Sequence, residues 1–163
     1  MNNLIFALII GISATLIMDL WGVIRKFLFD ITPPNYGLVG RWIAYMPRGR
    51  FRHESIAASS PVHGEYIVGW TAHYVIGIAF AALLISIWGG EWTQHPTIGP
   101  ALAVGIGTVL APFLIMQPSM GAGIAASRTP HPLSARVQSL ITHTVFGFGL
   151  YATGWAIRFF YSS

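Results

Sequence analysis

The sequence predicts an all-α integral membrane protein with four transmembrane helices, arranged as two parallel repeats of two helices each. Three observations point to this fold: an apolar composition, four long apolar stretches and an internal duplication. Of the 163 residues, 54% are hydrophobic and only 9% are charged, whereas charged residues make up about 25% of a typical soluble domain. The mean hydropathy of +0.62 agrees with this. A chain with so little polar surface is best solvated by a lipid bilayer, and we expect residues 1–163 to form a single integral membrane domain.

The net charge bears on whether the chain binds nucleic acid or a membrane. Nine Lys and Arg against five Asp and Glu give a net charge of +4 and a pI near 9.9. In so apolar a chain we attribute this excess to membrane topology, so the lipid bilayer is the expected partner and nucleic acid is not. The absence of cysteine excludes disulfides, thiolate metal sites and thiol nucleophiles.

The first expected span is Leu4–Phe29, which is long enough to cross a hydrocarbon core of about 30 Å. No basic residue precedes it, whereas Arg25 and Lys26 lie near its end, which argues against a signal peptide. Asp19 is the one acid within this span, on a narrow stripe of small and polar residues that share a helix face.

The first connection is the longest polar segment of the chain. Pro33 and Pro34 end the first span, and Leu38–Met46 is expected to form a short interfacial helix with aromatic residues at headgroup level. A basic stretch follows, whose arginines are Arg48, Arg50 and Arg52. These could bind an anion or a lipid headgroup, or they could act only as a topology signal on a solvated loop.

The other expected spans are Tyr66–Gly90, Ile98–Met116 and Val137–Tyr161. The second and fourth spans each carry one histidine, His73 and His143. The third contains Pro112 and continues into Gln117 and Pro118, which predicts a broken helix. Irregular backbone at membrane depth must be buried in protein or face water.

Three short motifs occur twice: an Ile-Ala-Ala-Ser segment, a His followed four residues later by a Gly, and a Leu-Ile-Met triplet followed by a polar residue. The copies are Ile56–Ser59 and Ile124–Ser127, His73 with Gly77 and His143 with Gly147, and Leu16–Asp19 and Leu114–Gln117. Internal repeats of this kind decide the fold prediction. They indicate two related halves of about residues 1–90 and 91–163, related by an axis along the membrane normal because each contains two spans.

The distribution of basic residues predicts the orientation. Eight of the nine lie in or beside the first and third connections: Arg25, Lys26, Arg41, Arg48, Arg50, Arg52, Arg128 and Arg136. Only Arg158 lies at the opposite end of a span. Because basic loops stay in the cytoplasm, both termini are expected in the periplasm.

A ring of polar residues is expected near the cytoplasmic side of the bundle. His73 and His143 lie about 9 Å into their spans, at 1.5 Å per residue, and an up-down bundle places these two helices on a diagonal. Asp19 falls at a similar depth, and the repeat aligns Gln117 with it. Ionisable residues in membranes are functional candidates by default, although the four could also serve only to hold helices together. The sequence contains none of the common catalytic motifs, so an enzyme is not expected.

Seven short segments with a distinctive composition are spread along the chain: Met18–Trp21, Tyr36–Trp42, Pro47–Phe51, Ala72–Tyr74, Met116–Pro118, Ala125–Pro130 and His143–Gly147. Together these segments resemble the DUF2938 family, a group of small bacterial inner-membrane proteins of unknown function. The resemblance covers nearly the whole chain. It implies a multi-pass protein of the bacterial inner membrane, and it supplies no activity.

Three functions remain open on these observations. The chain could bind or transport a small solute, a cation or protons at Asp19, His73, Gln117 and His143; four spans are few for a transporter, which favours a homodimer or a larger membrane complex. It could instead be a redox or metal protein that uses His73 and His143 as haem or metal ligands, which a Soret band would reveal. It could also be an accessory membrane subunit whose glycine-rich faces pack against a partner.

Overall fold

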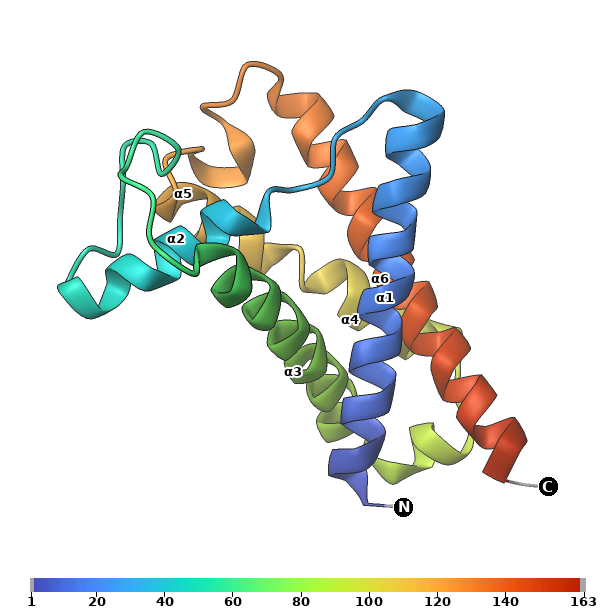
Figure 1. Ribbon diagram of the computed structural model, residues 1–163. Coiled ribbons are helices and arrows are strands. Elements are labelled where there is room, and N and C mark those ends of the chain that lie inside the picture. Colours follow the sequence, from blue (N-terminus) through green and yellow to red (C-terminus); the bar gives the residue numbers. More distant parts are fainter. Residues whose placement is uncertain (1, 162–163) are drawn as a thin grey trace. The chain divides into compact units, whose positions relative to one another are not determined.

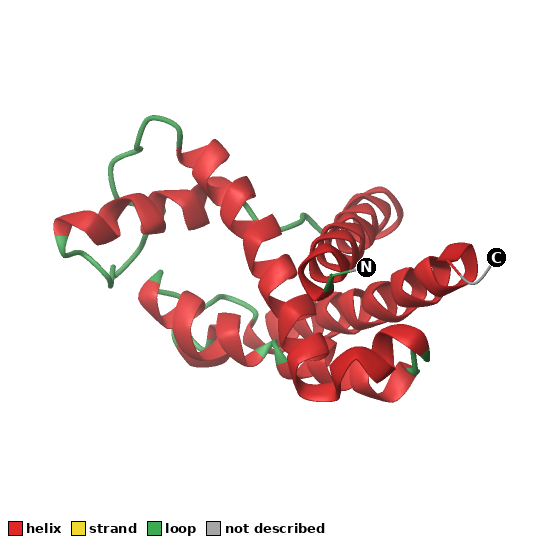
Figure 2. Cartoon of the chain, turned by 90° about the horizontal axis from the view of Figure 1, so that it is seen from below, coloured by secondary structure: helices red, strands yellow, loops and turns green. Residues whose placement is uncertain are grey.

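The computed structural model describes residues 2–161, and these form helices, turns and loops without strands (Figures 1 and 2). The α-helices are α1 (Asn3–Phe29), α2 (Tyr36–Tyr45), α3 (Glu65–Gln94), α4 (Ile98–Gly107), α5 (Gln117–Ser119) and α6 (Pro132–Tyr161). Shorter 3-10 helices are η1 (Met46–Arg48) and η3 (Ile124–Ala126), and η2 (Pro112–Met116) is a π-helix. The prediction of an all-α fold is therefore confirmed.

Three helical stretches in the described part of the chain are long and apolar enough to cross a membrane: Asn3–Phe29, Glu65–Gln94 and Ile98–Ser119. The last combines α4, η2 and α5. α6 is 30 residues long but is not among these apolar stretches, because His143 and several threonines interrupt its hydrophobic residues. Three of the four expected spans thus have the required length and composition, and the fourth stays a prediction.

Two irregularities shape the long helices. In α3, Gly89 has φ 71° and ψ −172°, which breaks the helical path near its C-terminal end. In the third stretch, the backbone changes from an α-helix to a π-helix at Pro112, whose missing N–H cannot make the regular bond to the preceding turn. The expected discontinuity near Pro112 is therefore present. The expected helix over Leu38–Met46 is also present, as α2, and its interfacial location stays a prediction.

The chain packs as two compact units. Unit 1 contains α1, α3 from Tyr74 onward, α4 and α6 from Leu140 onward, and unit 2 contains Pro34–His73 and Val109–Ser139. The core of unit 1 takes apolar side chains from all four of its helices. These are Ala7, Ile10, Ala14, Ala81, Leu84, Ile85, Trp92, Ala101, Val104, Phe146, Leu150 and Ile157.

Glycines bring the helices of unit 1 into backbone contact. A Cβ atom on Gly11 of α1 would lie 2.5 Å from Cα of Ile78 in α3, and one on Gly105 of α4 would lie 2.4 Å from Cα of Gly147 in α6. Small residues at such crossings are typical of membrane helices, where close packing replaces the hydrophobic driving force. The close packing of unit 1 therefore requires glycine at these crossings, because any larger residue would clash with the neighbouring helix.

In unit 2, Arg41 of α2 ties three segments together. Its Nε and Nη2 donate to the two carboxylate oxygens of Glu65, both at 2.8 Å. Its Nη1 donates to the backbone carbonyls of Ile56, Ala57 and Ser59 at 3.4, 3.4 and 2.9 Å. Both side chains of the ion pair are buried. The hydrogen bond to Glu65 raises the pKa of Arg41 above its ordinary value, against the opposite effect of burial.

The same region is reinforced by close backbone packing and by the loop before α3. A Cβ on Gly40 would lie 1.8 Å from the carbonyl oxygen of Glu65, so α2 and α3 touch without intervening side chains. The backbone N–H of His53 donates to the carbonyl of Ser119 at 2.8 Å, and that of Ile56 donates to Met120 at 3.0 Å. Residues from both halves of the sequence therefore build unit 2.

We expect Gly105→Ala to destabilise the protein by about 1–3 kcal/mol, the usual cost of overpacking a well-packed contact, because the new methyl group would meet backbone of α6. Gly107→Ala is the matched control, since a Cβ there meets nothing within 4 Å. Thermal unfolding of the detergent-solubilised variants measures both. Equal melting temperatures for the two variants would contradict the crossing.

We expect Arg41→Lys to lower the melting temperature by at least about 5 °C, because a single ammonium cannot reproduce the planar fork that serves one carboxylate and three carbonyls. Arg128→Lys is the control, since Arg128 is exposed. Limited proteolysis should also cut the loop 49–64 faster in Arg41→Lys. An Arg41→Lys variant as stable and resistant as Arg128→Lys would show that the pair is dispensable.

Candidate functional site

Asp19 lies in α1, and its carboxylate is oriented by a residue of α3. The hydroxyl of Tyr74 donates to Oδ2 of Asp19 at 2.9 Å, within unit 1. Asp19 is half-buried, and most of the large apolar residues beside it on α1 are exposed, as expected for a helix that faces lipid. A hydrogen bond from the neighbouring helix restricts the rotamers of a side chain, so Tyr74 orients the carboxyl group of Asp19.

His143 of α6 is held against α4. Its Nδ1 lies 3.2 Å from the carbonyl oxygen of Gly105 and 3.2 Å from Oγ1 of Thr108, and the Thr108 hydroxyl donates to the same carbonyl at 2.8 Å. In the tautomer with the hydrogen on Nδ1, this nitrogen donates to the carbonyl of Gly105, which can only accept. The remaining nitrogen, Nε2, is then the one able to take up a proton or bind a ligand.

Arg25 is a buried residue that the sequence analysis assigned only to topology. It lies inside α1, is 4% exposed, and its Nη1 donates to Oγ1 of Thr142 in α6 at 3.3 Å. A signal for this was present, because Arg25 continues the helical stripe of Gly11, Thr15 and Gly22, all of which are buried. A basic residue on the same helix face as the small, buried residues is therefore a sign of burial, and not only of topology.

His73 and Gln117 lie in unit 2. The His73 ring stacks on the ring of Tyr36, with centroids 4.1 Å apart and planes at 28°, and Trp70 approaches its edge at 5.8 Å. Gln117 is the first residue of α5. Its Oε1 is buried and has no hydrogen-bond partner among the described residues, which is rare for a buried amide oxygen.

The two units thus each hold two of the four residues predicted to form the polar ring: Asp19 and His143 in unit 1, His73 and Gln117 in unit 2. The complete ring stays a prediction, and so does the use of His73 and His143 as haem ligands. Within residues 2–161, no three His, Cys, Asp or Glu side chains group closely enough to hold a metal ion.

The basic segment after α2 is exposed at Arg48, Arg50 and Arg52. The guanidinium carbons of Arg48 and Arg50 lie 5.6 and 4.9 Å from the ring centroid of Tyr45, within the range of cation–π contacts. Phe51, between two of these arginines, is 59% exposed. The segment therefore presents positive charge and an apolar ring on one turn.

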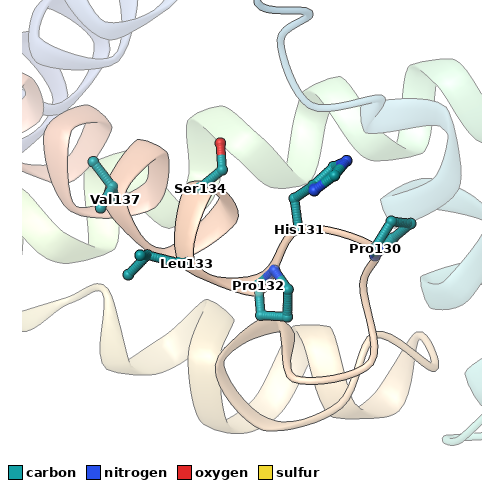
Figure 3. Close-up of a pocket in the computed structure, with 6 residues that line it drawn as sticks. All are labelled: Pro130, His131, Pro132, Leu133, Ser134 and Val137. Carbon is teal, nitrogen blue, oxygen red and sulfur yellow. The ribbon is translucent and has the colours of Figure 1, made fainter.

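A surface depression lies at the start of α6, lined by Pro130, His131, Pro132, Leu133, Ser134 and Val137. Figure 3 shows that these side chains follow one continuous stretch of chain, the loop before α6 and its first turns. None of the residues predicted from the sequence lines it. The depression therefore does not bring the predicted site residues together.

Comparisons with known proteins identify one family. No curated protein and no solved structure matches the chain significantly. The family model described as a protein of unknown function, DUF2938, matches residues 8–157. That range covers Asp19, His73, Gln117 and His143 as well as the basic segment. Since the match spans nearly the whole chain, the protein belongs to the DUF2938 family.

Proposed function

We propose that the protein binds and transports a small cation, or protons, within the bacterial inner membrane, at a polar site that includes Asp19, His73, Gln117 and His143. The observation that carries this proposal is the oriented carboxylate of Asp19 in an apolar helix. On insertion scales a charged Asp at a helix centre costs about 2.5–3.5 kcal/mol, whereas an interhelical hydrogen bond in a membrane returns about 0.6 kcal/mol on average. The free energy gained from holding two helices together is therefore smaller than the cost of placing the charge in the membrane.

The other residues of the site offer groups suited to cations or protons. In the tautomer in which Nδ1 donates to the carbonyl of Gly105, His143 keeps Nε2 as the nitrogen that can bind a proton or a cation. Gln117 contributes a buried amide oxygen without a partner among the described residues, and carboxylate and amide oxygens are preferred ligands of hard cations. These features support a binding role for each residue separately.

The helix contacts of unit 1 support the proposed two-helix repeat. α1 meets α3 at Gly11, next to Gly77, and α4 meets α6 at Gly105, opposite Gly147. Gly77 and Gly147 each follow a site histidine by four residues in the sequence. Each helix pair thus has a glycine contact near the glycine that follows its histidine by four residues, which supports the proposed repeat.

In each helix pair a threonine hydroxyl donates to the carbonyl of the contact glycine. The spacing between that glycine and the polar site residue differs between the two pairs. Thr15 donates to the carbonyl of Gly11 at 2.7 Å, and Thr108 donates to that of Gly105 at 2.8 Å. From Gly11 to Asp19 is eight residues, whereas from Gly105 to the aligned Gln117 is twelve. The four extra residues coincide with the end of α4 and the π-helix from Pro112.

In both Ile-Ala-Ala-Ser segments, backbone carbonyls accept hydrogen bonds from an arginine side chain. The first receives hydrogen bonds from Arg41 at the carbonyls of Ile56 and Ala57, and the second receives one from Nε of Arg136 at the carbonyl of Ala125, at 2.8 Å. In both halves an arginine side chain binds the backbone of the turn. This is what two copies of one ancestral unit would retain.

For the orientation, we expect a reporter enzyme that is active only in the periplasm to give signal when it is fused after Ser163. The same reporter inserted near Arg50 should give none, because the basic connections stay in the cytoplasm. Measuring reporter activity in intact cells, with protein amounts matched, tests both positions. The reverse pattern would refute the proposed location of the termini.

For the site, we expect Asp19→Asn to abolish cation or proton flux in proteoliposomes while its melting temperature stays within a few degrees of the wild type. Asparagine keeps the size of the side chain and removes the charge that the ligand would need. Flux is measured with a pH-sensitive dye under imposed Na⁺, K⁺ and proton gradients. His73→Gln and His143→Gln should share the phenotype, because all three residues would serve one ligand.

Asp30→Asn is the matched control for this experiment. Asp30 is the C-cap of α1 with φ 55°, a conformation that asparagine tolerates, and its side chain is 90% exposed. Normal flux in Asp19→Asn, or no flux in the wild type, would overturn the proposal and favour a structural subunit. Loss of folding in the Asp19, His73 and His143 variants together would point to helix packing, and a Soret band in the purified wild type would point to haem.

A further inference from the structure

The segment from Tyr36 to His53 contains four arginines and no acid. Arg41 is buried in its pair with Glu65, whereas the other three, Arg48, Arg50 and Arg52, are exposed. The nearest acid along the chain is Glu54, immediately after the segment. The exposed part of the segment is therefore a compact patch of positive charge that no described ion pair neutralises.

The arginines of this patch stand on an ordered turn. The N–H of Gly49 donates to the carbonyl of Met46 at 2.9 Å, and that of Arg50 donates to Tyr45 at 3.3 Å. Gly49 has φ 74°, which favours glycine. The indole Nε1 of Trp42 donates to the carbonyl of Phe51 at 2.9 Å. The turn is thus held at both ends, which lowers the entropy cost of binding a ligand.

The structure also connects this turn to the place where α3 begins. Arg41 binds Glu65, the first residue of α3 and of a candidate span, and the backbones of α2 and α3 touch at Gly40. Tyr66 and Trp70 on the first turns of α3 are 60% and 44% exposed, as is typical of aromatic residues at the membrane–water interface. α2 is therefore anchored to the end of a span.

We propose that the turn Met46–Arg52, whose arginines Arg48 and Arg50 lie over the ring of Tyr45, binds the phosphate groups of anionic phospholipids. The guanidinium groups of Arg48, Arg50 and Arg52 can form paired hydrogen bonds to phosphate oxygens. The exposed ring of Phe51 lies between two of them in sequence and can enter the boundary between headgroups and acyl chains. Basic clusters beside a span attract anionic lipids in this way. The proposal is independent of the cation site.

The test measures how lipids stabilise the full-length protein in a neutral detergent. Phosphatidylglycerol should raise the melting temperature of the wild type, and phosphatidylcholine and inorganic phosphate should not. The triple variant Arg48→Lys, Arg50→Lys and Arg52→Lys keeps the charge, and we expect it to lose at least half of the shift because lysine lacks the planar fork. High salt should reduce the wild-type shift, since exposed charges are screened.

Two further variants keep the test decisive. Phe51→Ala removes the exposed ring but leaves the carbonyl that Trp42 binds, and it should reduce the shift without changing stability in detergent alone. Arg128→Lys is the control and should behave as the wild type. A full shift in the triple lysine variant would overturn the proposal and leave a topology signal only. Equal shifts with phosphatidylcholine, or with inorganic phosphate, would overturn recognition of an anionic lipid.

Discussion

The guanidinium of Arg41 is the group on which unit 2 depends, because it binds three segments that the sequence separates. It pairs with the carboxylate of Glu65 at the start of α3 and donates to the turn that contains Ile56 and Ser59. Burying a charge pair is expensive unless the remaining donors and acceptors are satisfied. Here the third nitrogen is satisfied by backbone carbonyls, and Glu65 also accepts from the N–H of Val62 at 2.9 Å. This pair therefore fixes α2 to the start of α3.

Unit 1 is held together by close backbone packing at glycines, whereas unit 2 depends on a buried ion pair. Its helices meet at Gly11, Gly105 and Gly147, where there is no side chain to keep the backbones apart. Around these contacts lie polar groups that bond locally: the hydroxyl of Thr15 to its own helix, and that of Thr108 between α4 and His143. Close backbone approach leaves little room for water, so each polar group near it needs a partner from the protein. The glycines and the hydroxyl groups are thus parts of one packing arrangement.

Local patterns in the sequence were sufficient for the helices and not for the contacts between them. Apolar length and the proline pair predicted α1, α2 and α3 close to their observed bounds, and Pro112 predicted the break before α5. The burial of Arg25 and Arg41 was missed because their partners, Thr142 and Glu65, lie 117 and 24 residues away. In a basic membrane protein, arginines are attributed to topology first. Asp19 was located correctly in its helix, but Tyr74 was not foreseen as its partner, since no pattern links residues 55 apart.

The break at Gly89 sets the length of the straight part of α3. α3 has 30 residues, or about 45 Å at 1.5 Å per residue, which is longer than a hydrocarbon core of about 30 Å. Most long helices resolve such hydrophobic mismatch by tilting or by deforming the bilayer. In α3 the straight part ends at Trp88, and the residues after Gly89 turn aside and bury Trp92, whose Nε1 donates to the carbonyl of Thr97 at 3.0 Å. The straight part of α3, Glu65–Trp88, is therefore closer in length to a hydrocarbon core than the whole helix is.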